Sequence, residues 1–400
     1  MTETDALAPF EAASADTTPA NPHTSRRAEG VDIARAVAMI GMMAVHIGPT
    51  NLNTAAGMPF AMCHGRASVA FALIAGVGVS LLAASRAATP GRARMQLAWR
   101  AIILLPMGLM LQELDHWILV ILQNHALLFL LAIAVLGLPN RLLLLLAGVS
   151  AVLGPLWFLW GQIEEPQVYR RTAVAISDSL GDIAHRLVLS GPYPLITWAA
   201  PFLVGMWIGR KDIRAGRTRW LLAGCGLAAA ALAFFLSRGL QRVFGEPGFR
   251  AGWDYLTLDG PHSQMPLWLL GATGAAVFIL GLSLILAHAV GRCAWPLTVT
   301  GQLALTVYVA HLFALHWWRG PLTSRDPGEA GFLLLGMAGA AVIFCVIWRA
   351  LFSRGPLEAL FNPRLGVFLA IARFVFAPIR RVWSRRQEAP APPSGDGEDP

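Results

Sequence analysis

The sequence has few charged residues and few cysteines for its length. Charged residues make up 14% of the 400 positions, whereas soluble domains carry about 25%. Apolar residues make up 56%, more than a soluble fold of this size can bury. The four cysteines are far apart and form no C-x-x-C pair, so neither a disulfide framework nor a thiolate metal site is expected. These absences exclude a secreted disulfide scaffold, a disordered regulator and a conventional soluble nucleotide-binding enzyme.

Long apolar runs indicate an all-α, polytopic integral membrane helix bundle. A helix that crosses a bilayer needs about 20 mostly apolar residues. Ten runs fit, and they are Val31–Gly48, Ala67–Ala84, Gln96–Leu111, Trp117–Gly137, Leu142–Trp160, Leu195–Gly209, Trp220–Leu236, Gln264–Val290, Pro296–Trp317 and Ala330–Leu351. The shorter run Leu365–Phe376 is expected at the membrane surface, with an eleventh span as the alternative. Gly205 and Gly209 form a small-xxx-small pair, which is typical of close helix packing.

The distribution of arginine predicts the orientation of the bundle. Thirty of the 31 basic residues are arginine, and they lie mostly in short loops between the apolar runs. With both termini cytoplasmic, 21 basic residues fall on the inner side and 9 on the outer side, with Arg35 inside a span. Positive residues prefer the cytoplasmic side, so we expect ten spans with both ends inside. The net charge of +8 then reflects orientation, and no nucleic-acid partner is expected.

Composition also divides the chain into segments. Residues 1–29 and 387–400 are rich in Pro and polar residues and have no apolar stretch, so both tails are expected to be disordered. Residues 30–360 form the predicted transmembrane domain, and residues 361–386 form a basic, amphipathic interfacial segment. The outer loops Gly161–Pro194 and Arg238–Ser263 are the longest segments outside the predicted membrane.

The first predicted span carries three ionisable residues, Asp32, Arg35 and His46. Ionisable groups in lipid are costly, which favours a functional role. Eleven helical positions rotate about 1100°, so Arg35 and His46 share one face about 16 Å apart, and this face should point into the bundle. The alternatives are that Asp32 and Arg35 form an anchoring ion pair at the membrane interface and that His46 is solvated at the outer end.

Three other segments place polar residues at a similar outer depth. They are His64 with Arg66 before the second span, Gln123-Asn124-His125 in the fourth span, and Tyr308 with His311 in the ninth span. Histidine exchanges a proton near neutral pH and serves as a general base. The alternatives are a solvated loop histidine at His64 and plain hydrogen bonding between helices at Tyr308 and His311. No H-E-x-x-H and no phosphate-binding glycine loop occurs, so no metal site and no ATP-driven pump is expected.

The residues in this order resemble a known family. The stretch from Val31 to Ile40, VDIARAVAMI, resembles the start of transmembrane acyltransferases related to heparan-α-glucosaminide N-acetyltransferase. The spacing of Arg35 and His46 also resembles bacterial membrane O-acyltransferases that modify surface glycans. Two further segments resemble later motifs of the acetyltransferase family: Val120-Ile121-Leu122-Gln123 with Ala126-Leu127, and Gly301 with Tyr308 and His311. The second half, including the segment Arg354-Gly355-Pro356-Leu357-Glu358, looks like a bacterial membrane domain of unknown function.

The resemblance implies an acyltransferase in the inner or plasma membrane. The donor would be cytoplasmic acetyl-CoA or another acyl-CoA, and the acceptor an amino or hydroxyl group of an extracytoplasmic sugar, glycan or lipid-linked glycan. His64 would deprotonate the acceptor or carry the acyl group, and His46 would orient His64 or stabilise the oxyanion. Arg35 and the arginines of the inner loops would hold the phosphates of the donor. Further binding of donor and acceptor would fall to Asp32, Arg66, Gln123, Tyr308 and His311. Besides the lipid bilayer, a homodimer partner is left open.

Two other classes of function fit the same residues. A transporter or flippase for a small solute or lipid would line its path with such polar groups, although we find no internal repeat of the kind typical of transporters. A structural or regulatory membrane protein with a decayed site is the third reading. Flux without acyl chemistry would favour the transporter, and failure to bind any acyl-CoA would favour the structural protein.

Overall fold

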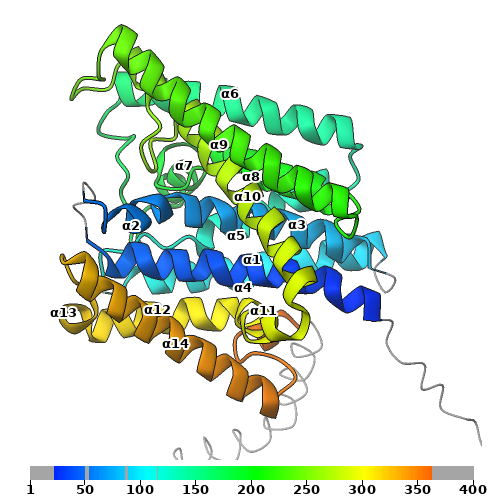
Figure 1. Ribbon diagram of the computed structural model, residues 1–400. Helices are drawn as coiled ribbons and strands as arrows, with labels where there is room; N and C mark the ends of the chain where they lie inside the picture. The colour runs from blue at the N-terminus through cyan, green and yellow to red at the C-terminus, as the bar shows by residue number, and fades with distance from the viewer. Residues whose placement is uncertain (1–21, 50–53, 86–88, 115, 363–400) are drawn as a thin grey trace, which may run out of the picture.

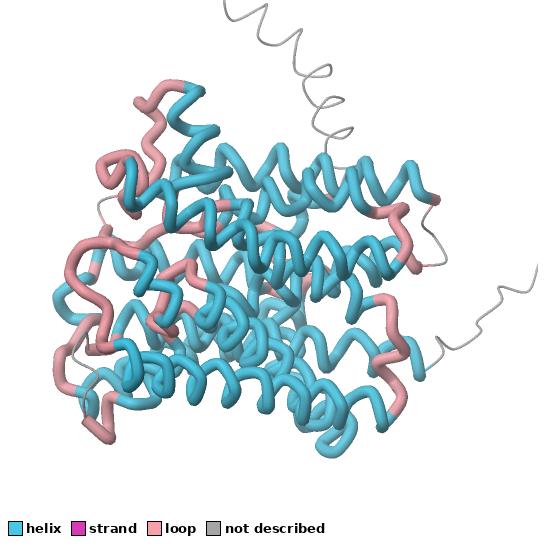
Figure 2. Tube along the Cα trace, turned by 90° about the horizontal axis from the view of Figure 1, so that it is seen from above, coloured by secondary structure: helices cyan, strands magenta, loops and turns pink. Residues whose placement is uncertain are grey.

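The computed structural model describes residues 22–49, 54–85, 89–114 and 116–362. The expected interfacial segment from residue 363 onward, the expected C-terminal tail and residues 1–21 of the N-terminal tail lie outside the described residues. The described part is helical, with loops gathered at two ends of the bundle (Figure 2). We call the end where α1 starts, near Arg35 and Arg100, the arginine end. The end where α1 finishes, near His46 and His64, is the histidine end.

The described residues form long helices joined by loops and shorter helical segments (Figure 1). The long helices are α1 (Pro22–Ile47), α3 (Arg66–Ala83), α4 (Pro90–Gln112), α5 (Leu122–Val135), α6 (Asn140–Glu164), α8 (Leu195–Gly209), α9 (Gly216–Phe244), α10 (Pro266–Val290), α12 (Ala304–Trp317) and α14 (Pro327–Leu351). The short ones are α2 (Met58–Cys63), α7 (Leu180–His185), η1 (Arg186–Ser190), η2 (Trp253–Thr257), η3 (Gly291–Ala294), α11 (Trp295–Gln302), α13 (Arg319–Leu322) and η4 (Glu358–Phe361).

Helix α1 lies in the middle of the bundle and packs against α3, α10, α11 and α14. Its apolar window is 61% buried, whereas the windows of α9 and α14 are 22% and 11% buried. The outer helices therefore turn apolar side chains away from the protein, as expected of helices that face lipid. The inward-facing stripe of α1 includes Met39 and Met42, which are fully buried as expected.

Seven helices among the described residues are long and apolar enough to cross a membrane, or eight if the bent pair Leu180–Ser190 and Leu195–Gly209 forms one span. This confirms an all-helical, multi-pass membrane protein. Helices α5 and α12 have 14 residues each, about 21 Å of helix, which is shorter than the hydrocarbon core of about 30 Å. Ten spans with both termini cytoplasmic stay a prediction.

The fourth predicted span, Trp117–Gly137, starts too early in the chain. Helix α5 starts only at Leu122, and the chain before it is not helical. The side chain of Gln112 explains this, because its Nε2 donates to Ile118 O at 3.0 Å and its Oε1 accepts from Val120 N at 2.8 Å. The amide satisfies buried backbone groups that a helix would otherwise pair.

The ninth predicted span, Pro296–Trp317, is also wrong as a single helix. It breaks at Leu303 into α11 and α12. The carboxylate of Glu358 caps the first turn of α12, since it accepts from Thr306 N at 2.9 Å and from Thr306 Oγ1 at 2.7 Å. An acidic group at a helix N-terminus satisfies free N–H groups and the helix dipole, so the second helix can start anew at this point.

Helix α1 begins at Pro22, before the predicted start of the transmembrane domain, and the disorder of the N-terminal tail stays a prediction. Proline fits the first position of a helix. The segment that follows contains Arg26, Arg27, Ala28 and Glu29, which are strong helix formers. The apolar run thus has a helical extension that an apolar window does not detect.

The small-xxx-small pair on α8 is confirmed as a close helix crossing. A Cβ on Gly205 would lie 1.9 Å from Leu73 O of α3, and one on Gly209 would lie 2.7 Å from Val77 O. Backbones this close leave no room for a side chain. The crossing brings α3, which carries part of the cavity wall described below, against α8.

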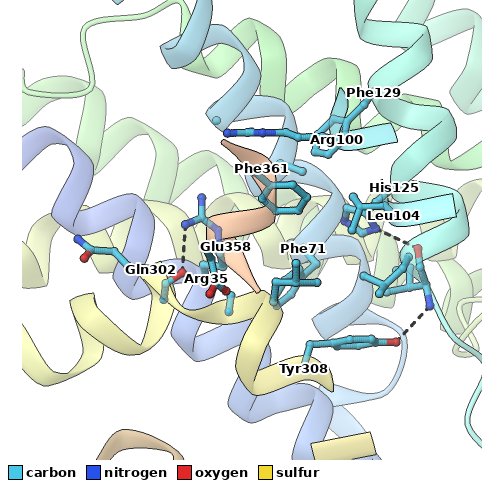
Figure 3. A pocket seen from close by; sticks show the side chains of 17 residues that line it. Arg35, Phe71, Arg100, Leu104, His125, Phe129, Gln302, Tyr308, Glu358 and Phe361 are labelled. Carbon is cyan, nitrogen blue, oxygen red and sulfur yellow. Dashed lines mark hydrogen bonds between the residues drawn. The ribbon is translucent and has the colours of Figure 1, made fainter. Parts of the chain in front are cut away.

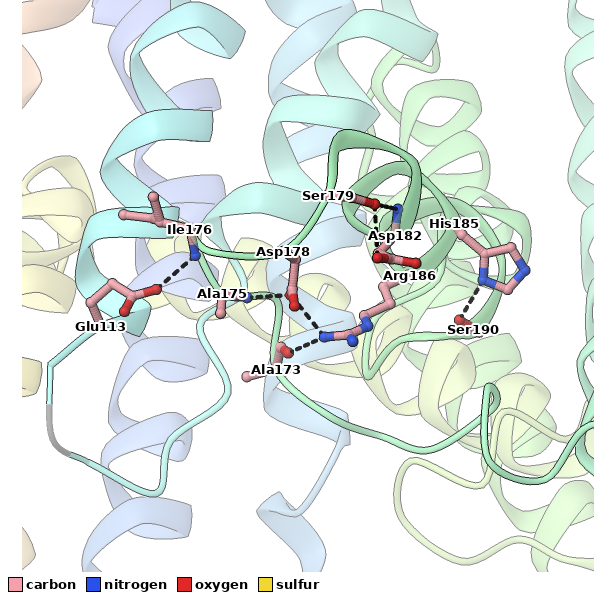
Figure 4. Close-up of polar contacts among 10 residues, drawn as sticks. All are labelled: Glu113, Ala173, Ala175, Ile176, Asp178, Ser179, Asp182, His185, Arg186 and Ser190. Atoms are coloured by element: carbon pink, nitrogen blue, oxygen red, sulfur yellow. Dashed lines mark hydrogen bonds and ion pairs between the residues drawn. The ribbon is translucent and has the colours of Figure 1, made fainter.

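The predicted outer loop Gly161–Pro194 has its own structure at the histidine end (Figure 4). Arg186 Nη1 donates to Asp178 Oδ2 at 2.8 Å and to Ala173 O at 3.0 Å. Ile176 N donates to Glu113 Oε1 at 2.8 Å, which ties the loop to the end of α4. Helix α7 and η1 follow, so the segment is folded rather than a plain connection.

Candidate functional site

A cavity of about 360 Å³ lies between α1, α3, α4, α5, α11, α12 and η4 (Figure 3). Its charged and polar lining residues are Arg35, Arg100, His125, Gln302, Tyr308 and Glu358. Apolar walls come from residues such as Phe71, Leu104, Phe129 and Phe361. A concave, mostly apolar site with a few polar groups is the usual form of a small-molecule pocket.

Of the predicted pair Asp32 and Arg35, only Arg35 lines this cavity, and both residues are held by α11. Arg35 Nη1 donates to Asp32 Oδ1 at 2.6 Å and to Gly301 O at 3.2 Å, while Gln302 Nε2 donates to Asp32 Oδ2 at 3.2 Å. The ion pair that we considered as an alternative therefore exists. It does not exclude binding, because a guanidinium has five N–H donors and Arg35 also lines the cavity.

Arg100 is the second cation of the cavity, and sequence reasoning counted it among the inner-loop arginines that would hold the phosphates of a donor. It lies within α4, with its guanidinium 5.5 Å from the centre of the Phe361 ring. Its Nε is buried and has no partner, and the side chain donates no hydrogen bond within the described residues. An arginine fork with free donors suits a phosphate or carboxylate.

Tyr308 and His125 form the far wall of the cavity, and both bind the same residue. Tyr308 Oη accepts from Ile121 N at 3.2 Å, and His125 Nδ1 lies 3.1 Å from Ile121 O. Tyr308 was predicted to line a site, but His125 was only one of three polar candidates in its segment. The irregular start of α5 turns His125 toward the cavity.

The predicted residues His46 and His311 meet beyond Tyr308. Their rings stack with centroids 5.3 Å apart, and His46 Nδ1 lies 3.1 Å from His311 Nε2. The centroid of the Tyr308 ring is 5.2 Å from that of His311. Helix α1 thus supplies Arg35 to the cavity and His46 to the histidine end, on the shared face that its periodicity predicts.

The tautomers of this pair follow from the hydrogen bonds. His311 Nδ1 lies 3.4 Å from Val307 O, and a carbonyl only accepts, so Nδ1 carries the proton. His311 Nε2 then accepts from His46 Nδ1–H. The remaining nitrogen of His46, Nε2, is therefore the basic one.

His64 lies between α2 and α3 at the histidine end, within electrostatic reach of His46 and His262. Its Nε2 is buried without a partner, and so is Nε1 of Trp268, which a Cβ on the adjacent Gly65 would approach to 3.1 Å. Gly65 has φ +71°, a left-handed conformation that glycine adopts without strain. The tight turn at Gly65 therefore lies beside two buried polar atoms that have no partner, His64 Nε2 and Trp268 Nε1.

An aromatic wall stands behind His64. The ring of His262 lies 5.7 Å from Tyr193, 6.3 Å from Trp198 and 5.8 Å from Trp268, centroid to centroid. Burial among these rings, together with Arg171 and His64, lowers the pKa of His262 to about 3. His262 and Gln264 both have positive φ, 57° and 65°, a strained backbone of the kind found at functional sites.

Gln123 and Arg66 do not join the cavity. Gln123 Nε2 donates to Gly108 O at 2.9 Å, which fastens α5 to α4, so a packing role is the simplest reading of this residue. Arg66 is the first residue of α3, next to His64. Sequence reasoning did not name Glu358 as a site residue, and within the segment Gln123-Asn124-His125 it singled out Gln123 rather than His125.

Comparison with known proteins adds one match. A family model described as an acyltransferase domain matches residues 117–352, more than half of the chain. The matched range includes His125, Tyr308 and His311 but begins after α1, so it does not contain Arg35 or His46. No curated protein matches the chain. Within the described residues, no group of His, Cys, Asp and Glu side chains is arranged to hold a metal ion.

Proposed function

We propose a reaction for this chain, which belongs to the acyltransferase domain family. It moves an acyl group from cytoplasmic acyl-CoA to an amino or hydroxyl group of an extracytoplasmic sugar or glycan. The acyl group that we propose first is acetyl. The observation that carries this proposal is the arrangement of the two ends. A cavity with two arginines begins at the arginine end and stops at Tyr308, and the paired histidines His46 and His311 lie directly beyond it.

The cavity suits the donor. Arg35 and Arg100 offer guanidinium donors for phosphate groups, and the apolar walls suit the thioester arm. The volume of about 360 Å³ is at the small end of ligand pockets, which run from about 300 to 1,000 Å³. This size favours a short acyl chain such as acetyl over a long fatty chain.

The histidine end suits the acceptor. In our proposal, His64 takes the proton of the acceptor with its buried, unpartnered Nε2. His46 has an unprotonated Nε2 in the tautomer derived above, so it accepts a hydrogen bond or proton, and this favours an orienting role over stabilising an oxyanion. The partly exposed His262 lies at the same end, in front of the fully buried rings of Trp198 and Trp268.

The test uses purified protein in detergent with radiolabelled acetyl-CoA and a panel of amino sugars and glycans. We expect label on an acceptor, and a complete loss of transfer in His64→Ala with unchanged folding and unchanged binding of acetyl-CoA. Full transfer by His64→Ala would refute the assignment of the base. Neither binding nor transfer with acetyl or longer donors would refute the use of coenzyme A.

A transporter is the second candidate, and the broken helix at Leu303 is the observation that favours it. Interrupted helices next to a binding site are typical of secondary transporters, and Gly301, Gln302 and Ala304 at this break all line the cavity. The protein in proteoliposomes would then move solute or lipid across the membrane without acyl transfer. Flux that persists in His64→Ala and without any acyl donor would favour this alternative.

A further inference from the structure

Helix α3 presents one face to the cavity, and the side chains on that face differ in size. Phe71, Ala75 and Gly78 line the cavity, at spacings of four and three residues, which share a helix face. Between residues 67 and 80 these three are partly accessible, and all the others in this range are buried. The open surface of this part of α3 is therefore the surface that it turns to the cavity.

The smallest of the three residues lies at the arginines, and the largest lies at the far wall. A Cβ on Gly78 would lie 3.9 Å from Arg35 Nη2. The ring of Phe71 instead lies edge-on to that of His125, with centroids 6.3 Å apart. About two helical turns, or about 10 Å along the axis, separate the two positions. Along the cavity, this wall thus changes from no side chain to a methyl group and then to a phenyl ring.

Helix α12 shows the same order of sizes. Ala304 and Tyr308 line the cavity about one helical turn apart. Ala304 lies next to the helix break and close in the chain to Gly301, whose carbonyl binds Arg35 at 3.2 Å. Tyr308 lies at the far wall, as Phe71 does (Figure 3). Two walls from different parts of the chain therefore narrow the cavity in the same direction, away from the arginines.

The far wall is held in place by the backbone of Ile121. Tyr308 Oη accepts from Ile121 N at 3.2 Å, and His125 Nδ1 lies 3.1 Å from Ile121 O. The residue against which Phe71 packs is therefore fixed, so the phenyl ring has a firm support. The hydroxyl hydrogen of Tyr308 makes no hydrogen bond to a described residue, and it is free to donate to a carbonyl oxygen.

We propose that Phe71 limits the acyl group of the donor to a short chain. This inference rests on the proposed function and names the residue that selects among acyl donors. With the phosphates at Arg35 and Arg100 and the thioester carbonyl at Tyr308, the acyl chain points at the ring of Phe71. An acetyl group ends before the ring, and a longer chain meets it. One methylene more than a site accepts lowers the affinity about 10–200-fold.

Calorimetry with coenzyme A and with acetyl-, butyryl- and hexanoyl-CoA tests this limit without knowledge of the acceptor. The unaltered protein should bind acetyl-CoA best and lose at least about tenfold in affinity for butyryl-CoA. In Phe71→Ala the order should reverse, because the space of the ring takes up the added methylenes, each of which then gains about fourfold in affinity. The Kd for coenzyme A itself should stay the same, since its thiol ends before the ring.

Phe129→Ala is the matched control, because Phe129 also lines the cavity. It lies about two helical turns along α5 from Leu122, and therefore about 10 Å from the far wall. Its loss should change the Kd values of coenzyme A and of all three donors by one common factor. Phe71→Leu guards against a folding defect in Phe71→Ala, and it should shift the preference in the same direction by a smaller step.

The ratio of two Kd values within one protein is the quantity that decides, because it does not depend on the fraction of folded protein. An unchanged ratio of butyryl-CoA to acetyl-CoA in both Phe71 variants would overturn the inference and leave the proposed function standing. A preference of the unaltered protein for hexanoyl-CoA, or an equal shift in Phe129→Ala, would do the same. A protein that neither binds nor transfers any acyl group would overturn both.

Discussion

The cavity and the histidine pair His46–His311 treat buried polar groups in opposite ways. In the cavity, Arg100 Nε and His125 Nε2 are buried without partners, as His64 Nε2 is elsewhere at the histidine end. His46 and His311, in contrast, bind each other. Unpaired groups are costly unless something fills the space between them. The difference indicates that the cavity is built to bind a ligand, whereas the paired histidines are already positioned before one arrives.

The two regions also differ in how the backbone is held. The cavity depends on close contact between helices, because a Cβ on Gly301 would lie 1.8 Å from Asp32 O. The histidine end depends on strained loop residues, and Gln264 holds them by accepting from Thr197 Oγ1 at 2.9 Å and donating to Pro192 O at 3.0 Å. Changes at the cavity should therefore act through packing, and changes at the histidine end through hydrogen bonds and charge.

Replacing Gly301 should have the largest effect. In Gly301→Ala the new Cβ meets the backbone of α1, so α1 and α11 must separate and the position of Arg35 changes with them. Overpacking of this kind costs about 1–3 kcal/mol and occasionally more. We expect loss of acyl-CoA binding by calorimetry, together with a large drop in thermal stability in detergent.

Gly78→Ala is the matched control, since Gly78 lines the same cavity. Its Cβ would meet only Arg35 Nη2, at 3.9 Å, which is ordinary contact. Alanine also favours a helix over glycine by about 1 kcal/mol, so stability should be kept or raised. Equal behaviour of the two variants would contradict the packing role of the crossing between α1 and α11.

Arg100→Gln should weaken donor binding by about 10–100-fold, because a hydrogen bond to a charged group contributes about 1.5–3 kcal/mol. The Kd for acetyl-CoA distinguishes the cavity from the histidine end. Arg100→Gln should raise this Kd, whereas His64→Ala should leave it unchanged and remove turnover. Arg94→Gln, exposed on the same helix, should change neither. An unchanged Kd in Arg100→Gln would place the donor outside this cavity.

The sequence predicts which face of α1 carries Arg35 and His46, but it does not predict the cavity. Helical period alone puts Arg35 and His46 on one stripe, and both contact the α11–α12 segment. The start of α5 and the break at Leu303 depend on the distant side chains of Gln112 and Glu358. Because these contacts are not local in sequence, periodicity could not single out His125, whose orientation depends on them.

The histidine end should respond to pH through His262. Its pKa of about 3 lies below the ordinary value of 6.5, so the unfolded chain takes up the proton first. Stability should be constant above about pH 6.5 and fall as the pH decreases toward 3, by at most about 1.4 kcal/mol per pH unit. Thermal unfolding at several pH values measures this slope.

His262→Asn should flatten that slope, because asparagine does not titrate and tolerates positive φ. Its stability at pH 7 should fall through the lost ring contacts, so the slope and not the midpoint is the diagnostic quantity. Binding of acetyl-CoA at pH 7 should not change, since His262 is not among the residues that line the cavity. An equal slope in the variant and the unaltered protein would assign the acid sensitivity to other groups.

The smallest effect is expected in the folded loop at the histidine end. Asp178→Asn removes the charge that pairs with Arg186, but Arg186 keeps its bond to Ala173 O. Partly exposed pairs contribute about 0.2–1 kcal/mol, so the unfolding midpoint should shift slightly and acetyl-CoA binding should not change. If the loop receives the acceptor, the KM for the acceptor should rise while the Kd for acetyl-CoA stays the same. A higher Kd for acetyl-CoA would show that the two ends are coupled, and the contrast between a donor cavity and a separate acceptor region would no longer hold.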